Sequence, residues 1–162
     1  MSTSAQTIIH RRVPGDASKE LFRIYRSHDG YIEDCGHSMD LAHAMMAADH
    51  VISEMDSALT RPEYFDHQSV WINALLANLF ICEMPCSNLC TSEPTAYPSS
   101  TIAMEIQPAR EAEGCEYAYH VYPPYRDHPA EVIVTMPDTG MIAFEGSAQA
   151  LVAESLARSK SK

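Results

Sequence analysis

Residues 69–82, with the sequence SVWINALLANLFIC, form the most apolar stretch of the chain. After Ser69 only Asn73 and Asn78 are polar, so a helix here would be apolar on every side. Such a helix has to be buried, in a core or against a partner. It also holds the only tryptophan, and it is too short and too interrupted by asparagine to span a bilayer. We therefore predict a buried central helix. The residues that we expect to be almost fully buried are Trp71, Leu75, Leu79 and Phe80.

The chain before this segment predicts a second helix with one apolar face. Apolar residues recur at helical spacing over 41–59, and Ser38 is placed to cap the helix. The opposite, polar face carries Asp40, His43, Asp49, His50, Glu54 and Asp56. A capping-box sequence at 60–63 and a second cap at Asp66 then predict the start of the central helix, and Pro85 predicts its end.

A chain of 162 residues fits one domain with a substantial core. We expect residues 1–15 to form a flexible arm, with a short strand at 7–13, because Pro14-Gly15 closes this segment. We expect 16–162 to form a single α+β domain.

Residues 21–25 and 31–35 predict a β-hairpin. The first segment alternates well enough for a strand, the sequence His-Asp-Gly at 28–30 is typical of a tight turn, and the second segment is placed to return as its partner. Asp-Gly is typical of tight hairpin turns, because it accepts the positive φ angles that such turns require. A helix over 17–26 is the alternative interpretation of the first of these segments.

The second half of the chain predicts four strands and a last helix. The strands are expected at 101–107, 115–122, 131–136 and 141–144, and Ser147 is placed to cap the helix. The predicted fold is therefore of the α+β class. It has an antiparallel sheet and about three helices, in the order ββα-α-ββββα.

The charge of the chain is unevenly distributed. The total is −11, but residues 1–26 and residues 158–162 each carry +3, so residues 27–157 carry −17. A body this acidic repels nucleic acid and lipid headgroups and attracts basic surfaces. Charge therefore argues against direct binding to nucleic acid or to a membrane.

The cysteines indicate a reducing compartment. There are five, an odd number, and no basic segment followed by an apolar run begins the chain. We therefore expect free thiols and a cytoplasmic protein.

Three cysteines at four-residue spacing, Cys82, Cys86 and Cys90, could hold zinc or an iron–sulfur cluster. Further ligands would have to come from Cys35, Cys115 or His37. The spacing contains no Cys-x-x-Cys pair, and a cysteine in an apolar helix behaves as a small apolar residue. We predict structural thiols that tolerate serine, with no metal and no cofactor.

The polar face of the first predicted helix offers a second metal hypothesis. His43 and His50 are two turns apart on this face, and Glu54 follows His50 by one turn. Asp34, Cys35, His37 and Asp40 lie close by in the sequence. A divalent metal could bind such a set, which gives a small metal-dependent hydrolase as an alternative function. No HExxH motif is present, so a solvated helix face is the preferred interpretation.

Two further patterns need an interpretation. Asp138-Thr139-Gly140 matches the aspartic-protease triplet, but Pro137 precedes it between two strands, and we predict a turn. Tyr117 and Tyr119 are expected on one face of a strand. Such tyrosines are equally typical of interfaces and of half-buried strand positions, and the sequence does not separate the two.

We therefore predict an acidic, non-enzymatic interaction protein that binds a basic protein surface. A protein that blocks a nucleic-acid-binding complex, as viral anti-defence proteins do, fits this character. The alternatives are the metal-dependent hydrolase and an oligomeric structural or assembly subunit. The sequence is also compatible with a homodimer. The expected partner-binding residues are Asp40, Asp49, Glu54, Asp56, Glu111, Glu113, Glu116, Tyr117 and Tyr119.

Overall fold

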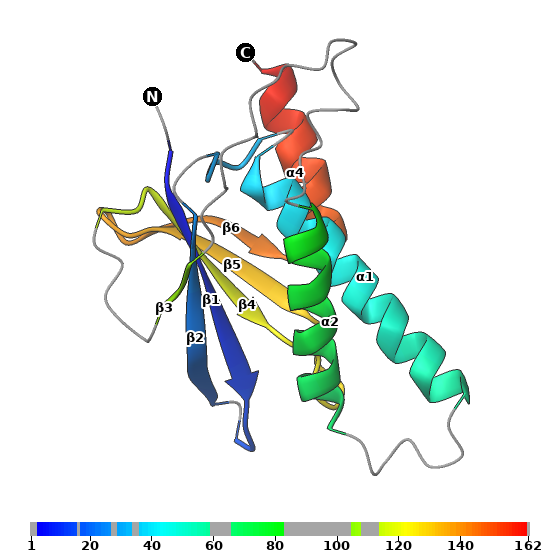
Figure 1. Ribbon diagram of the computed structural model, residues 1–162. Helices are drawn as coiled ribbons and strands as arrows, with labels where there is room; N and C mark the ends of the chain where they lie inside the picture. Colours follow the sequence, from blue (N-terminus) through cyan, green and yellow to red (C-terminus); the bar gives the residue numbers. More distant parts are fainter. Residues whose placement is uncertain are drawn as a thin grey trace.

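The computed structural model describes residues 3–15, 17–26, 29–33, 36–58, 66–82, 105–107 and 114–161 (Figure 1). The strands are β1 (Ala5–Arg12), β2 (Ser18–Arg26), β3 (Glu105–Gln107), β4 (Tyr117–Tyr122), β5 (Glu131–Met136) and β6 (Met141–Gly146). The helices of this part of the chain are α1 (His37–Ala58), α2 (His67–Cys82) and α4 (Ala148–Lys160). The α+β class and the order ββα-α-ββββα are as predicted.

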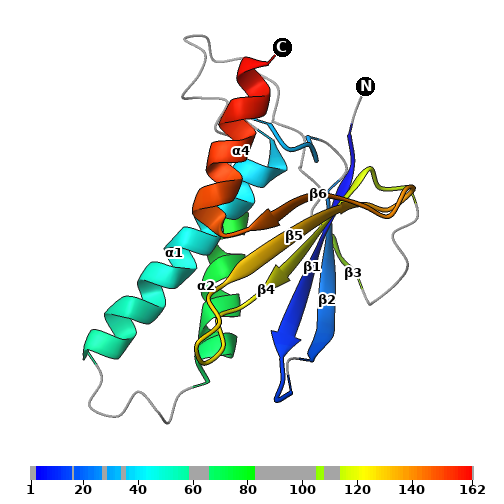
Figure 2. The ribbon, with the colours of Figure 1, turned by 180° about the vertical axis from the view of Figure 1, so that it is seen from behind.

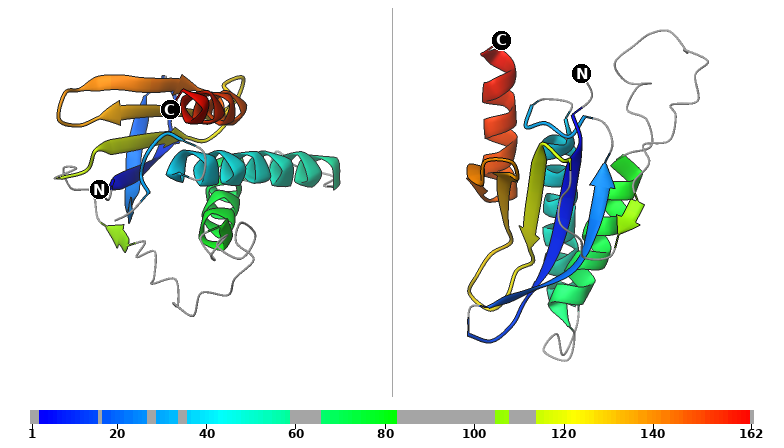
Figure 3. Two further views of the ribbon diagram at one scale, coloured as in Figure 1. Left: turned by 90° about the horizontal axis from the view of Figure 1, so that it is seen from above. Right: turned by 90° about the vertical axis from the view of Figure 1, so that its left-hand side faces the viewer.

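The six strands form one sheet in the order β3-β2-β1-β4-β5-β6. Every neighbouring pair is antiparallel except β1 and β4, which are parallel. The sheet is strongly twisted, so that β1 and β2 run at a steep angle to β5 and β6 (Figure 2). The described helices all lie on one face of the sheet (Figure 3). The right-hand panel of Figure 3 shows the opposite face, turned toward the viewer.

The helix α2 packs in the core along one side only. Trp71, Leu75 and Leu79 are fully buried, as predicted. Phe80 is 41 % exposed, so its predicted burial is wrong. The reason is geometric: Phe80 shares an outward face with Asn73, and α1 and the sheet contact the opposite face. Although α2 has apolar residues on every side, only the side that faces α1 and the sheet is buried.

The predicted hairpin of 21–25 and 31–35 is wrong, because β2 pairs with β1 and β3 instead. The turn of the real hairpin contains Pro14-Gly15, where Gly15 has a φ of 86°. Asp29 does adopt a positive φ of 56°, but Gly30 serves a close approach to β1. A Cβ added at Gly30 would lie 2.6 Å from Ala5 Cβ.

The N-terminal segment is a central strand of the sheet, so the short strand predicted at 7–13 is present, but the expectation of a flexible arm is wrong. Residues 5–12 form β1, with β2 on one side and β4 on the other. Its residues Ala5 to His10 are all buried. The polar members of this run have partners inside the protein, as described below, and this explains how such a polar strand can be buried.

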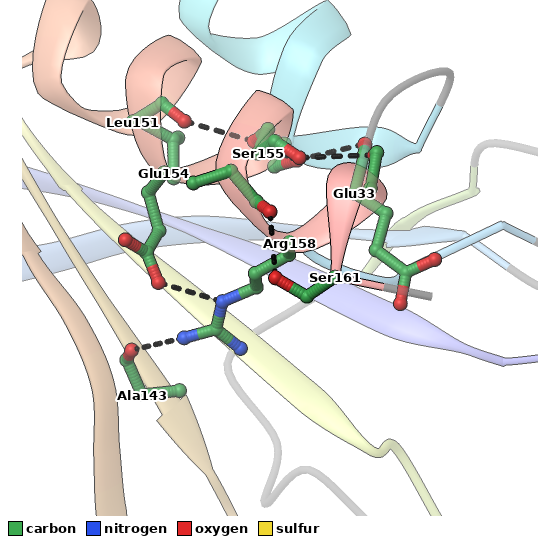
Figure 4. A network of polar contacts seen from close by, with 10 residues as sticks. Glu33, Ala143, Leu151, Glu154, Ser155, Arg158 and Ser161 are labelled. Atoms are coloured by element: carbon green, nitrogen blue, oxygen red, sulfur yellow. Dashed lines mark hydrogen bonds and ion pairs between the residues drawn. The ribbon is translucent and has the colours of Figure 1, made fainter.

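The free edge of the sheet at β6 is fastened to α4 (Figure 4). The β5–β6 pairing shifts register between Val134 and Thr135, so that Ala143 is an extra, bulged residue in β6. The Ala143 carbonyl accepts a hydrogen bond of 2.9 Å from Nη2 of Arg158 in α4. Arg158 Nε in turn donates to Glu154 at 2.7 Å. The bulge thus turns a backbone carbonyl toward the helix that follows the strand.

Several local predictions are confirmed. Ser147 caps α4 by accepting from Ala150 N, and Asp66 caps α2 by accepting from Ser69 N. Residues 136–140 form a turn in which Thr139 and Gly140 both donate to the Met136 carbonyl. Ser38, by contrast, lies inside the first turn of α1, where its hydroxyl is 2.7 Å from that of Ser155 in α4. The capping-box segment 60–63 lies outside the described residues. None of the described helices is both long and apolar enough to cross a bilayer.

Candidate functional site

The acids predicted on the polar face of α1 are not equivalent. Asp40 forms an ion pair with Arg26 at 2.8 Å, and Asp49 accepts a 2.7 Å hydrogen bond from Nε1 of Trp71. Asp56 pairs with His67 of α2 at 2.8 Å. Glu54 is exposed and has no such partner among the residues that the structure describes. Three of the four acids are therefore engaged within the protein, and Glu54 is the one that faces solvent unpaired.

Asp49 joins the two long helices. Its partner Trp71 is fully buried, so the indole N–H needs an acceptor inside the protein. Burial raises the pKa of the Asp49 carboxyl, and the hydrogen bond from Trp71 lowers it, with burial the larger effect. Asp49 is thus a structural residue of the α1–α2 contact and not a free surface charge.

Asp40 belongs to a buried polar network at the start of α1. His37 is fully buried, with Nε2 at 2.5 Å from Thr7 Oγ1 and Nδ1 at 3.0 Å from Arg26 Nη1. The His37 ring also packs edge-on against Tyr119. Burial, and next the Arg26 charge, lower the pKa of His37 to about 3, so the imidazole is neutral. These contacts hold β1, β2, β4 and α1 together.

The remaining predicted contact residues of the described chain lie in or just before β4, and they differ in how far they are buried. Tyr119 is fully buried and donates to the Gly30 carbonyl at 2.9 Å, so it cannot contact a partner, and that prediction is wrong. Tyr117 shares the helix-facing side of β4 and is half-buried. Glu116, just before the strand, is exposed. Glu111 and Glu113 lie outside the described residues.

The sheet face away from the helices carries a histidine pair that the sequence analysis missed. His10 of β1 stacks on Tyr122 of β4, with ring centroids 4.5 Å apart, and its Nε2 lies 3.2 Å from Nδ1 of His120. The only local signal is that β1 and β4 each contain one histidine; the sequence does not show that the two strands pair.

Both imidazoles of this pair are held neutral. Burial, and next the charge of His120, lower the pKa of His10 to about 4. Burial, and next the Arg23 charge, lower the pKa of His120. His120 Nε2 is 3.5 Å from Thr135 Oγ1, which is too long for a strong hydrogen bond to activate that hydroxyl. The pair therefore acts as a packed, acid-sensitive part of the sheet.

Two hollows flank the β4–β5 loop. One, of about 230 Å³, is lined by Arg12, Tyr122 and Glu131 among others, and Arg12 and Glu131 form a 3.0 Å ion pair. The other, of about 470 Å³, is lined by the paired Asp56 and His67 and by Arg126. Most charges that line these hollows already have a partner, so neither hollow offers an evident small-molecule site.

Within the described ranges, no group of three or more His, Cys, Asp or Glu residues is placed to hold a metal ion. His43 and His50, central to the hydrolase hypothesis, are both exposed on α1. Cys115 is a buried free thiol whose pKa is raised by burial. Cys35, Cys86 and Cys90 and the side chain of Cys82 lie outside the described part, so the predictions for them stay predictions.

Ion pairs within the protein neutralise most of the described arginines and leave several exposed acids without a partner. Five arginines are paired with carboxylates: Arg11 with Asp66, Arg12 with Glu131, Arg23 with Glu20, Arg26 with Asp40, and Arg158 with Glu154. Among the described residues, the exposed acids without an ion pair are Asp29, Glu54, Glu116, Asp127, Asp138 and Glu145. The cations without one are Lys19, Arg126 and Lys160. The charges left unneutralised are thus mainly negative.

Comparison with protein-family models, with curated proteins and with solved structures finds no match to this chain.

Proposed function

We propose that this protein is a non-enzymatic interaction protein that binds the basic surface of a partner protein. The observation that carries the proposal is that most arginines are neutralised internally, whereas six exposed acids have no ion pair among the described residues. A surface with this charge accelerates association with a basic partner and disfavours acidic ones. A groove that normally holds nucleic acid presents such a basic surface, so occupying it is the inhibitory form of this function.

The structure changes which acids are assigned to this function. Of the predicted contacts, Glu54 and Glu116 are retained because both are exposed and unpaired. Asp40 and Asp49 are replaced, because their carboxylates serve the fold. Exposed acids from the other elements take their place: Asp29, Asp127, Asp138 and Glu145.

The proposal is tested by capturing partners from the native cell and then measuring their association with purified variants. We expect Glu54→Lys, Asp127→Lys and Asp138→Lys, combined, to slow association, and we expect the parent to associate more slowly as salt is raised. A control places lysine at three exposed neutral positions, Ser53, Ser57 and Gln149, which adds half as much positive charge and removes no acid. Association that ignores both salt and charge reversal would contradict the proposal.

A further inference from the structure

The edge strand β6 exposes the two most solvent-accessible large apolar side chains of the described chain. Met141 is 59 % exposed and Ile142 is 58 % exposed. β5 is the only strand paired with β6 in the part of the chain that the structure describes. Exposed apolar residues on an unpaired sheet edge mark a place where another chain can pack.

The bulge at Ala143 determines how this edge presents its side chains. Ile142 is opposite Thr135, and Glu145 is opposite Ile133. Ile133 is opposite His120 of β4, and Thr135 Oγ1 lies 3.5 Å from His120 Nε2, so both residues lie on the sheet face away from the helices. The extra residue therefore places Ile142 and Glu145 on the same face, although they are three positions apart.

Negative charge frames the two apolar residues along the chain. Asp138, in the turn before β6, and Glu145, within it, are exposed and have no ion pair with any residue of the described part of the chain. The nearest arginine that contacts the strand, Arg158, is neutralised by Glu154. Met141 is opposite Met136, so it lies on the other face of the strand from Ile142 and Glu145. An extended segment that runs along this edge contacts both faces, so its apolar side chains meet Met141 and Ile142 and its lysines or arginines meet the acids.

We propose that the β6 edge is the contact surface for the basic partner, and that it takes an extended basic segment with apolar residues between its cations. This inference rests on the proposed function and gives it a location. Net charge decides against a second copy as the occupant, because two chains of −11 repel each other. Met141 and Ile142 supply most of the affinity, and Asp138 and Glu145 supply orientation and rate.

The experiment titrates the isotopically labelled full chain with a synthetic peptide that has leucines between pairs of lysines, and follows backbone amides by NMR. The largest shifts are expected at Met141 and Ile142. Ile142→Ser should weaken peptide binding about tenfold, the worth of one buried isoleucine. Val51→Ser, at a residue of 38 % exposure on α1, is the matched control and should leave binding unchanged. Met141→Ser provides an independent repeat. A version of the peptide with glutamates for lysines should not bind.

The outcomes separate the location from the function. Shifts centred on α1 near Glu54, with no effect of Ile142→Ser, would overturn the edge assignment and leave the acidic-surface function standing. Failure of the basic peptide to bind anywhere at low salt, or equal binding of the glutamate version, would contradict the function itself. Sedimentation that shows a dimer of the free chain, abolished by Ile142→Ser, would make a second copy the occupant and would also overturn the inference.

Discussion

Asp49 shows how a residue that seems to belong to the surface is committed to the interior. Its place on the polar face of α1 predicts a solvated acid, yet it accepts the indole N–H of a fully buried tryptophan. A buried donor that loses its acceptor costs the free energy of its desolvation. Asp49→Ala should therefore lower the free energy of unfolding by about 1–3 kcal/mol, measured by urea denaturation. Glu54→Ala, one turn further along and unpaired, is the control and should change it little.

The neutral histidines predict an acid-sensitive fold. The pKa of His37 is lowered from 6.5 to about 3 and that of His10 to about 4, so the folded protein resists protonation that the unfolded chain accepts. Their contribution is fully present above pH 6.5 and is lost progressively as the pH falls toward about 4 for His10 and about 3 for His37. The urea concentration at the midpoint of unfolding should therefore decrease as the pH is lowered from neutral to about 5. His10→Phe, which keeps a ring against Tyr122, should flatten this dependence, and the exposed His43→Gln should not.

At the scale of the element, the two sides of α2 differ in what they contribute. Leu75→Ala, at a fully buried position, should cost about 2–5 kcal/mol of unfolding free energy, because it leaves a cavity. Phe80→Ala, in the same helix at 41 % exposure, should cost much less. Thermal or urea unfolding of the two variants checks this contrast. Equal losses would mean that the outward face of α2 is also packed.

Elements with a local signal were predictable, and elements that depend on distant partners were not. The sequence predicts β5 at its exact bounds, because four β-branched residues follow one another over 132–135 and a turn sequence begins at Pro137. Where β1 lies, the sequence predicts only a short strand within a flexible arm, because Gln6, Thr7 and His10 are polar and their partners lie in other elements. Its parallel pairing with β4 joins residues more than one hundred positions apart, which leaves no local pattern. The candidate site followed the same rule: helical periodicity found the acids, but not the Trp71 or Arg26 groups that engage two of them.

At the scale of the whole molecule, net charge opposes association between copies of the chain. The charge is −11 at pH 7 and the isoelectric point is near 5.0. As the pH approaches that point the repulsion disappears, and the exposed Met141 and Ile142 are free to drive association. Light scattering should show particles that grow as the pH falls toward about 5, less so for Ile142→Ser. Growth that is equally strong at neutral pH would show that charge is not what keeps the chain dispersed.

The contact between Trp71 and Asp49 equips the molecule with its own optical reporter. The chain has one tryptophan, so its fluorescence arises from a single indole. That indole is sealed from water between α1 and α2, and its N–H is held by a carboxylate of the neighbouring helix. Any ligand, partner or variant that separates these helices will hydrate the ring and shift its emission to longer wavelength. A partner that binds at the distant β6 edge will leave the emission unchanged, so one spectrum distinguishes docking on the sheet edge from opening of the helical layer.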